Sequence, residues 1–499
     1  MLMLNKQQLT AQKTKNLPKL PAPVHMAQEV GKSLGRSAVL LRPLPRGTQK
    51  VTKVTTVIFW FRNDLRLHDQ PALAHAIALA NKQGATLLPV YCHAPESLSR
   101  WGFERVGAHR QAFTAQTLAD VSAQLSARGS HLLQCAGTPE SVFPALAQAL
   151  GANDQGDCHS VCEAIAAPEE QAEVAALRAL GLSVNEIWQS SLLHPEDLPF
   201  APANLPPVFT TFRNAVERAQ VQPRAPLPAP AAVPALPDQA LWSDWQSAAS
   251  MHIAAVDNER SSFPYACVAF AGGETAALAH LAQYLARKLP HSYKQTRNGL
   301  MGMDYSSKFS PWLATGALSP RQVMAALRQF EAEHGANDGT YWLWFELLWR
   351  DYFRLLHLQY GAALYRERGL SAQQQAPQPF HNPQGFARWR QGCTGEPLVD
   401  AAMCELAATG YLSNRLRQVA ASYLIYDLHG DWRAGAAWFE HCLLDYDPYS
   451  NQGNWLYIAG RGTDPRGGRR FNPHKQAQDH DADGSYRRLW DATSAHPPA

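Results

Sequence analysis

The stretch that most constrains the fold is residues 54–61, a nearly continuous run of β-branched and aromatic side chains. Such a run is typical of a strand buried on both faces of a parallel sheet. Further strands are predicted at residues 85–91, 130–135, 160–165 and 182–188, with helices at 71–82, at 105–128 and between the later strands. This alternation predicts a parallel sheet with crossover helices, which is a Rossmann-like α/β domain.

The first predicted strand is followed by Arg62-Asn63-Asp64-Leu65-Arg66 and not by a glycine-rich turn. A dinucleotide site of the usual kind needs glycines here, so we do not expect one in the α/β domain. Ten prolines lie between residues 199 and 237, most densely at 223–234. Such a composition favours extended and poorly ordered chain, and predicts a linker between two domains.

From about residue 263 the spacing of apolar residues changes to three and four, as in amphipathic helices. Helices are predicted at 276–288, 320–334, 342–360, 398–406, 412–428 and 432–442. The predicted domains are a basic tail at 1–53, the α/β domain at 54–190, the linker at 191–262, an all-helical domain at 263–480 and a C-terminal tail at 481–499.

Charge and cysteine content exclude several classes of protein. The net charge of +3 is nearly balanced, so a nucleic-acid surface must be local, for example around Arg461, Arg466, Arg469 and Arg470. Eight scattered cysteines without paired metal-ligand spacing predict reduced thiols in an intracellular protein. No metal site is predicted. Because no apolar run reaches about 18 residues, no membrane span is predicted.

The first 53 residues contain ten Lys and Arg but a single acidic residue, Glu29. An acid-poor, basic start is typical of an organelle transit peptide. This one is richer in lysine than in arginine and poor in serine, so a disordered extension or an upstream start codon is an equal alternative. We expect a cytoplasmic monomer, with an organelle as the alternative location.

One segment, residues 444–455, concentrates polar side chains. Two carboxylates, an amide and an indole follow one another in it: Asp445, Asp447, Asn451 and Trp455. Pro448 and Gly453 predict an irregular turn and not the interior of a helix. A calcium loop is not predicted, because the other acidic, glycine and terminal glutamate positions are missing. From the residues alone, a polar surface turn and a binding site stay open.

Three further stretches accompany this segment: a hydroxyl-rich run at 305–312, an aromatic helix at 342–353 and Asn-Arg-Leu-Arg at 414–417. In this order the four resemble the flavin domain of the photolyase and cryptochrome family. The wording Arg-Asn-Gly-Leu-Met-Gly-Met-Asp-Tyr at 297–305 resembles its cryptochrome DASH branch. The resemblance covers about residues 54–473. It implies a blue-light-dependent FAD protein that splits cyclobutane pyrimidine dimers, mainly in single-stranded DNA. The alternatives are a photoreceptor that signals to a partner, and a nucleic-acid binder in which FAD is structural.

The resemblance also implies which residues hold FAD. They are Tyr293, Ser306, Ser307, Lys308, Phe309, Ser310, Glu346, Arg350, Asn414, Arg417, Asp445, Asp447 and Asn451. Hydroxyls and free amides at a helix start suit phosphate oxygens, although a plain N-cap is the alternative reading. Asn451 is implied to face N5 of the flavin. A neutral amide there both donates and accepts, which favours a photolyase-like redox cycle over plant-type signalling.

Glu346 and Asn451 are the implied catalytic residues, and Trp349, Arg415, Gln418 and Tyr457 are the implied DNA contacts. In this interpretation Trp349 stacks on a flipped pyrimidine pair and Glu346 binds the base edge. The alternative partner for a Glu on such an apolar helix is Arg350, four residues on. Tyr457 stands where ordinary dimer photolyases have a second stacking Trp, which weakens the clamp and favours single strands.

Trp455 and Trp432 match the inner members of an electron relay, and the outer position falls near Phe380. Because no Trp stands there, the alternatives are slower photoreduction and an exit through Trp389 or a tyrosine, and core packing is the alternative role for all these indoles. A methenyltetrahydrofolate antenna is also implied, but Gln116 stands where its glutamate contact is expected. Because an amide cannot form that ionic contact, the antenna is left open.

Overall fold

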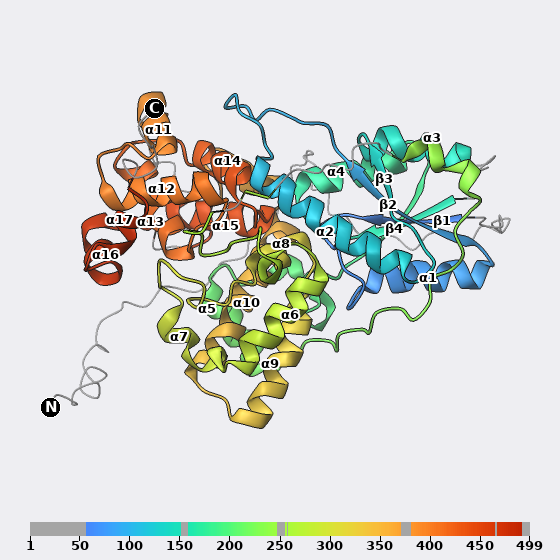
Figure 1. Cartoon of the computed structure of the whole chain (residues 1–499), viewed down its shortest axis with the longest axis horizontal. Helices are drawn as coiled ribbons and strands as arrows, with labels where there is room; N and C mark the ends of the chain where they lie inside the picture. The colour runs from blue at the N-terminus through green and yellow to red at the C-terminus, as the bar shows by residue number, and fades with distance from the viewer. Residues whose placement is uncertain are drawn as a thin grey trace, which may run out of the picture. The chain divides into compact units, whose positions relative to one another are not determined.

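Five parallel strands form one sheet in the order β3-β2-β1-β4-β5 in the computed structural model of the chain (Figure 1). The structure describes residues 56–150, 158–246, 255–256, 258–370, 381–464 and 467–491. The strands are β1 (Thr56–Phe61), β2 (Thr86–His93), β3 (Leu133–Ala136), β4 (Cys158–Glu163) and β5 (Ser183–Ile187). The central strand β1 pairs with β2 in the register Thr56↔Thr86 and with β4 in the register Thr56↔Cys158. The tail at 1–53 lies outside the described residues.

Helices cover both faces of this sheet, which explains the unbroken apolar run of β1. Val57, Phe59 and Phe61 pack under α1 (Pro71–Gln83) and α2 (Ala108–Ser126). Ile58 and Trp60 pack under α3 (Pro139–Ala149) and α4 (Pro168–Ala179) on the other face. Successive residues of a strand point to opposite faces of the sheet. Helices on both faces therefore bury both sets of side chains. The predicted parallel α/β domain is confirmed.

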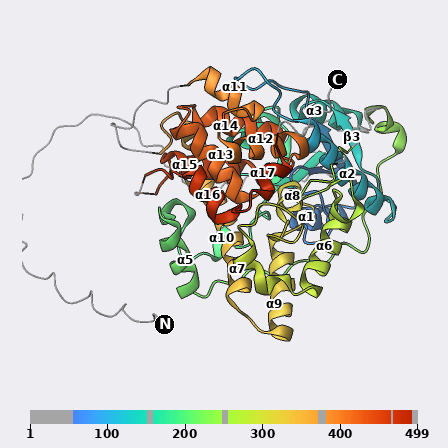
Figure 2. The same ribbon diagram turned by 60° about the vertical axis from the view of Figure 1, so that its left-hand side comes forward.

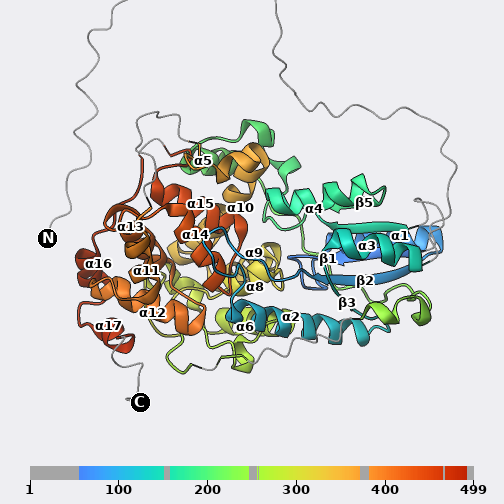
Figure 3. The ribbon, with the colours of Figure 1, turned by 90° about the horizontal axis from the view of Figure 1, so that it is seen from above.

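The second half of the chain is helical, as predicted (Figures 1 and 3). Its helices are α5 (Phe209–Arg218), α6 (Glu274–Ala286), α7 (Tyr293–Thr296), α8 (Ser310–Thr315), α9 (Pro320–His334), α10 (Asp338–Tyr360), α11 (Pro383–Gln391), α12 (Pro397–Thr409), α13 (Asn414–Tyr426), α14 (Trp432–Cys442), α15 (Pro448–Ala459), α16 (Pro473–His480) and α17 (Ser485–Leu489). Short 3₁₀ helices occur at Pro195–Asp197, Pro202–Asn204, Gln239–Leu241, Ser243–Trp245, Val268–Phe270, Leu289–Ser292 and Gly361–Tyr365.

The prediction of an irregular turn at 444–455 is wrong for most of that segment, which forms α15. Asp447 caps the helix by accepting from the backbone N–H groups of Tyr449 (2.9 Å) and Ser450 (3.3 Å). Pro448 occupies the first helical position, where its missing N–H has no consequence. Gly453 lies inside the helix. The residue there must be glycine, because an added Cβ would lie 2.1 Å from the Phe353 ring. The two residues that suggested a turn instead mark a helix start and a close approach.

Two other boundaries also differ from the prediction. The densest part of the proline-rich stretch, residues 223–235, has no helix or strand, but it is fixed to the α/β domain, since Leu227, Pro230 and Ala235 accept hydrogen bonds from Asp69, Arg128 and Leu87. The prediction assigns residues 481–491 to a C-terminal tail. In the structure they are part of the folded region, because Tyr486 and Trp490 are only 1% and 2% exposed. The Tyr486 hydroxyl donates to buried Glu405 at 2.6 Å.

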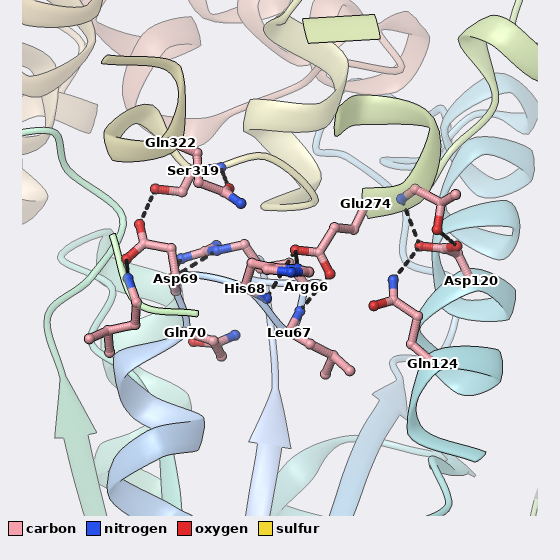
Figure 4. A network of polar contacts seen from close by, with 12 residues as sticks. Arg66, Leu67, His68, Asp69, Gln70, Asp120, Gln124, Glu274, Ser319 and Gln322 are labelled. Carbon is pink, nitrogen blue, oxygen red and sulfur yellow. Dashed lines mark hydrogen bonds and ion pairs between the residues drawn. The ribbon is translucent and has the colours of Figure 1, made fainter. Parts of the chain in front are cut away.

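The segment that follows β1 joins the sheet to the helical region (Figure 4). Arg66 donates to the carbonyl of Gly316 at 2.9 Å. The buried carboxylate of Asp69 accepts from Arg321 at 2.8 and 2.9 Å. Glu274 accepts from the backbone N–H groups of Leu67 (2.9 Å) and His68 (3.0 Å). The segment after β1, which lacks phosphate-binding glycines, therefore forms a contact between the α/β domain and the helical region.

Candidate functional site

Helices α13, α14 and α15 enclose a pocket of about 70 Å³. Residues predicted to serve the flavin ring, a base or the electron relay line it: Asn414, Arg417, Gln418, Asp445, Asp447, Asn451 and Trp455. Phe439 and Leu443 supply its apolar wall. The pocket thus combines a few polar groups with an apolar surface, as ligand pockets usually do.

An ion pair between the partly exposed Arg417 and the buried Asp445 fixes the polar side of this pocket. Arg417 donates to both carboxylate oxygens of Asp445, at 2.9 and 2.8 Å, and to the carbonyl of Leu412 at 2.8 Å. Burial alone would lower the pKa of Arg417, but the charge of Asp445 outweighs it and raises that pKa. The expected pair is therefore present, and its role toward a flavin remains a prediction.

Asp447 also lines the pocket, but its oxygens serve the protein itself. Besides capping α15, it accepts from Arg354 at 2.9 Å, and Arg350 lies 3.9 Å away. Burial would raise the pKa of Asp447, but these two arginines outweigh it and hold the pKa below its usual value. Arg350 donates to the carbonyls of Ser190 and Leu313 at 2.6 and 3.0 Å. It braces the region behind the pocket and is not among the residues that line it.

Asn451 has one end of its carboxamide fixed by the protein. Its Nδ2 donates to the carbonyl of Ala436 at 3.0 Å, and this bond decides which end of the amide carries the oxygen. The residue lines both the small pocket and a larger cavity beside it. With its N–H₂ group engaged, the side chain offers the pocket an acceptor oxygen.

The serine run 306–310 forms an unusual loop before α8. Ser306 and Lys308 have positive φ angles of 58° and 60°, so the backbone alternates in hand. Such alternation turns successive N–H groups into a concave anion site. Arg417 lies over the Tyr411 ring at 5.8 Å, and the hydroxyl of Tyr411 hydrogen-bonds to Ser310. The loop and the small pocket are therefore neighbours.

Lys308 is 1% exposed, and its Nζ has no hydrogen-bond partner in the described part of the chain. The ammonium lies 3.2 Å from the centroid of the Tyr305 ring. Burial lowers the pKa of Lys308 well below its usual value. A buried amine that has no hydrogen-bond partner among the described residues, next to a loop whose N–H groups can form an anion site, fits a phosphate-bearing ligand.

Glu346 pairs with a residue that sequence reasoning missed. Its carboxylate forms an ion pair with Arg297, whose guanidinium lies 4.3 Å from the Trp342 ring. Arg350, considered above as the alternative partner, is wrong because it is bound to backbone carbonyls. The signal was available, since Arg297 begins the motif at 297–305 and an acid on an apolar helix needs a cation.

Trp349 and Tyr457 lie together beside a small apolar pocket of about 50 Å³. Trp349 stacks on Phe209 with a centroid distance of 3.7 Å and an interplanar angle of 10°, and Tyr457 meets its edge at 6.0 Å. The Tyr457 hydroxyl accepts from Arg469 at 2.9 Å. One face of Trp349 is thus occupied by the protein's own chain.

The cations predicted to meet DNA fall into two groups. Arg415 donates to Gln418 (3.2 Å) and to Asn298 (3.1 Å) and has no carboxylate partner among the described residues. Arg469 and Arg470 instead pair with Asp464 and Asp427, at 2.7 and 2.6 Å. Arg461 is 8% exposed, and Arg466 lies outside the described residues. The suggested basic patch is therefore largely neutralised.

Trp455 contacts two rings that lead away from the small pocket. Phe439 lies 5.2 Å from it and Trp389 lies 6.4 Å from it, both edge-on. Trp389 is fully buried and donates to the carbonyl of Ala420 at 3.0 Å. Trp432 is also buried and donates to the carbonyl of Glu367 at 3.1 Å. Phe380, at the expected outer relay position, lies outside the described residues.

A second, larger cavity of about 920 Å³ lies where the order of the sheet reverses between β1 and β4. Ligands of open α/β sheets bind at such switch points. Arg110, Trp432 and Tyr446 are among its lining residues, and the Arg110 guanidinium lies 4.6 Å from the Tyr446 ring.

Gln116 is not among the residues that line this cavity. It donates to the carbonyl of Tyr265 at 3.2 Å and accepts from the N–H of Gly272 at 2.8 Å.

Two negative findings apply to the residues that the structure describes. No three His, Cys, Asp or Glu side chains among them are grouped so as to hold a metal ion. None of the described helices is both long and apolar enough to cross a bilayer.

Comparison with known proteins agrees with this geometry. Residues 57–232 match the family described as DNA photolyase, and residues 342–498 match the FAD binding domain of DNA photolyase. An α/β sheet domain joined to a helical flavin domain defines the class, and the chain belongs to the photolyase/cryptochrome family.

The relatives define the group within that family. A protein of Gloeobacter violaceus named cryptochrome DASH is 44% identical over 87% of this chain and 85% of its own length. A rice protein (Oryza sativa) named cryptochrome DASH, chloroplastic/mitochondrial, is 39% identical over 87% of this chain and 76% of its own length. The crystal structure of a cryptochrome from Synechocystis superposes with a TM-score of 0.77 at 40% identity, covering 88% and 89% of the two chains. The chain is a member of the cryptochrome DASH group.

Proposed function

We propose that this protein binds FAD and repairs cyclobutane pyrimidine dimers, mainly in single-stranded DNA, under blue light. When bound, FAD supplies a light-excited electron donor. The observation that carries the proposal is the position of Glu346. Its side chain is 31% exposed and ion-paired to Arg297, one helical turn from Trp349. A carboxylate kept accessible beside a stacking ring suits recognition of a base edge and has no role in core packing.

The residues around the small pocket would hold the cofactor. The loop at 306–310 and Lys308 would bind phosphate oxygens, because an anion supplies the hydrogen-bond acceptor that the Lys308 amine lacks among the described residues. Arg417 and Asp445 would bind the polar edge of the ring. Asn451 would accept a hydrogen bond through the oxygen that its bond to Ala436 leaves available.

The substrate side would accept a flipped base pair at Trp349 and Tyr457. Tyr457 stacks less strongly than an indole, and its hydroxyl is engaged by Arg469. Taking bases out of a duplex costs a few kcal/mol, and the cost is least for bases that are already unpaired. A weakened clamp therefore supports activity on single strands. Arg415, which no carboxylate neutralises in the described part of the chain, would contact a phosphate, with Gln418 beside it.

The test is repair of a defined thymine dimer in single- and double-stranded oligonucleotides under blue light. We expect dimer loss in the single strand to exceed that in the duplex, and no loss in the dark. Light-dependent binding of a protein partner without any dimer loss would favour the photoreceptor alternative. Failure to bleach flavin absorbance on illumination with a reductant would favour a structural role for FAD.

We propose the larger cavity as the position of a second chromophore, with Arg110 and Tyr446 as an aromatic and cationic wall. Gln116 does not fit the role of a folate contact. Both ends of its amide already bind backbone groups, the carbonyl of Tyr265 and the N–H of Gly272, and so connect α2 to the helical region. Absorption of the purified protein before and after incubation with methenyltetrahydrofolate tests this. A stoichiometric new band despite Gln116 would show that the folate uses other contacts.

The remaining proposals concern assembly and location. We propose a monomer in the cytoplasm, with an organelle as the alternative suggested by the basic start of the chain and by the chloroplastic/mitochondrial name of the rice relative. Light scattering of the purified protein tests the first, and imaging of the full chain against a form starting at residue 54 tests the second.

A further inference from the structure

The first three turns of α10 carry aromatic side chains that the core buries only in part. These are Tyr341, Trp342, Trp344, Phe345 and Trp349, which we call the aromatic row. The leucines between them, Leu343, Leu347 and Leu348, face the core and are 5%, 7% and 0% exposed. Tyr341 keeps 39% of its surface exposed. A set of partly exposed aromatic rings on one helix, beyond what the core needs, points to an interaction site.

The aromatic row is continuous with the proposed base site. Its ring centroids are 5.6 Å apart for Tyr341–Trp344, 6.3 Å for Tyr341–Phe345 and 4.5 Å for Trp342–Phe345. Phe209 of α5 links Phe345 (5.2 Å) to Trp349 (3.7 Å). Positions 341, 345 and 349 are four apart and share one face of the helix. Figure 2 shows α5, α7 and α10 close together on this side of the helical region.

Cations lie against two rings of the row and against Tyr457 beside it, but they are already paired. Arg213 lies 5.7 Å from the Phe345 centroid, Arg297 lies 4.3 Å from Trp342 and Arg469 lies 4.8 Å from Tyr457. Their carboxylate partners are Glu217 (3.6 Å), Glu346 and Asp464 (2.7 Å). The surface therefore offers ring faces and guanidinium planes but little uncompensated charge. Bases suit it better than phosphates do.

We infer that the aromatic row is a stacking track for the unpaired nucleotides that flank the lesion. This inference rests on the proposed function, because the track ends at Trp349. Aromatic faces bind successive bases without regard to sequence, and a single strand exposes base faces that a duplex hides. The track favours single strands because it binds their exposed bases. This adds to the preference that weaker stacking at Tyr457 gives against duplexes. Tyr341 and Trp344, at the end remote from Trp349, determine how much of the strand is held.

The test is dark binding of undamaged, fluorescein-labelled oligothymidylates of increasing length, followed by fluorescence anisotropy. Trp344→Ala and Tyr341→Ala should each weaken binding of long single strands about fivefold or more, by the loss of one stacked base. The shortest strands and a duplex should be bound as by the unchanged protein. Trp344→Phe should restore most of the affinity. Leu358→Ala is the matched control, because Leu358 is on the same helix, is 37% exposed and lies off the track.

Salt dependence separates stacking from charge. Tyr341→Ala and Trp344→Ala should leave the slope of log affinity against log salt unchanged, whereas Arg415→Ala should reduce its magnitude by about one. Unchanged affinity of both alanine variants for long strands, or an equal loss for single strands and duplex, would overturn the inference. Flavin absorbance and the melting temperature of each variant show that it is folded. Because no light or lesion is used, a wild type that fails to repair dimers while its track variants lose affinity would refute only the proposed function.

Discussion

The small pocket and the aromatic row differ in how their polar and apolar groups are satisfied. In the pocket, Arg417, Asp445 and Asp447 are held by each other or by the backbone, and Asp445 is 5% exposed. On the row, aromatic faces are left partly in water, and the side chains of the neighbouring pair Arg213 and Glu217 are 25% and 37% exposed. The first arrangement is preorganised for a ligand that stays bound. The second suits a ligand that comes and goes, since little must be rearranged to cover it.

The largest expected effect, on both stability and flavin content, tests the preorganised side. Asp445→Ala removes the buried partner of Arg417, whose own side chain is 23% exposed, and should lower the free energy of unfolding by about 3 kcal/mol. Flavin content should fall with it. Thermal unfolding and flavin absorbance measure both. The control is Asp304→Ala, because Asp304 and Arg287 form an exposed pair and its loss should stay within about 1 kcal/mol. Equal losses in the two variants would contradict the distinction.

The stability of the folded protein should depend on pH through Glu405, a buried carboxyl group that interacts electrostatically with Lys308. Burial raises the pKa of Glu405 to about 7, although hydrogen bonds from Tyr486 and Ser262 and the charge of Lys308 oppose the rise. Between the unfolded pKa of about 4.3 and the folded value, the folded state binds the proton and the unfolded state does not. The stability from Glu405 is thus complete below that window and is lost as the pH rises through it.

Glu405→Gln removes this titration and should remove the pH dependence, which amounts to about 4 kcal/mol across the window. The variant should gain relative to the wild type from pH 5 to pH 8. Urea unfolding at both pH values measures the difference. Parallel curves for the two proteins would show that Glu405 does not titrate there.

The base side should respond in activity and not in folding. Glu346→Gln keeps the shape but removes the charge, and should reduce single-strand dimer repair by roughly 10- to 100-fold, the range for loss of a charged hydrogen bond. Flavin content and melting temperature should be unchanged, since the side chain is partly exposed. Repair at the wild-type quantum yield would remove Glu346 from the chemistry.

The smallest effect comes from Lys308→Met, and its sign should depend on the ligand. Without flavin the variant should be more stable by about 1 kcal/mol, because an unpaired buried amine is replaced by an apolar chain. With flavin the order should reverse, since the phosphate loses a charged partner. Melting temperatures of both forms measure this. A variant that is less stable in both would indicate that Lys308 is needed for packing.

Local pattern was enough for the elements whose apolar spacing is unambiguous. The run at β1 could only be a strand buried on both faces, and the helices at 320–334 and 432–442 have the predicted limits. The motif order along the chain likewise indicated a flavin domain. Pro448 and Gly453 misled because a helix start and a close helix contact use the same residues as a turn.

The sequence by itself determined the fold class, the family and the set of polar residues near the pocket. Only the tertiary structure decided which groups the predicted residues contact. Glu346 pairs with Arg297 and not with Arg350, Gln116 accepts from the backbone N–H of Gly272, and Phe209 covers one face of Trp349. The physical reason is range. Periodicity and capping act within a few residues, whereas ion pairs and ring contacts join segments that are far apart in the chain and meet only when the core has formed.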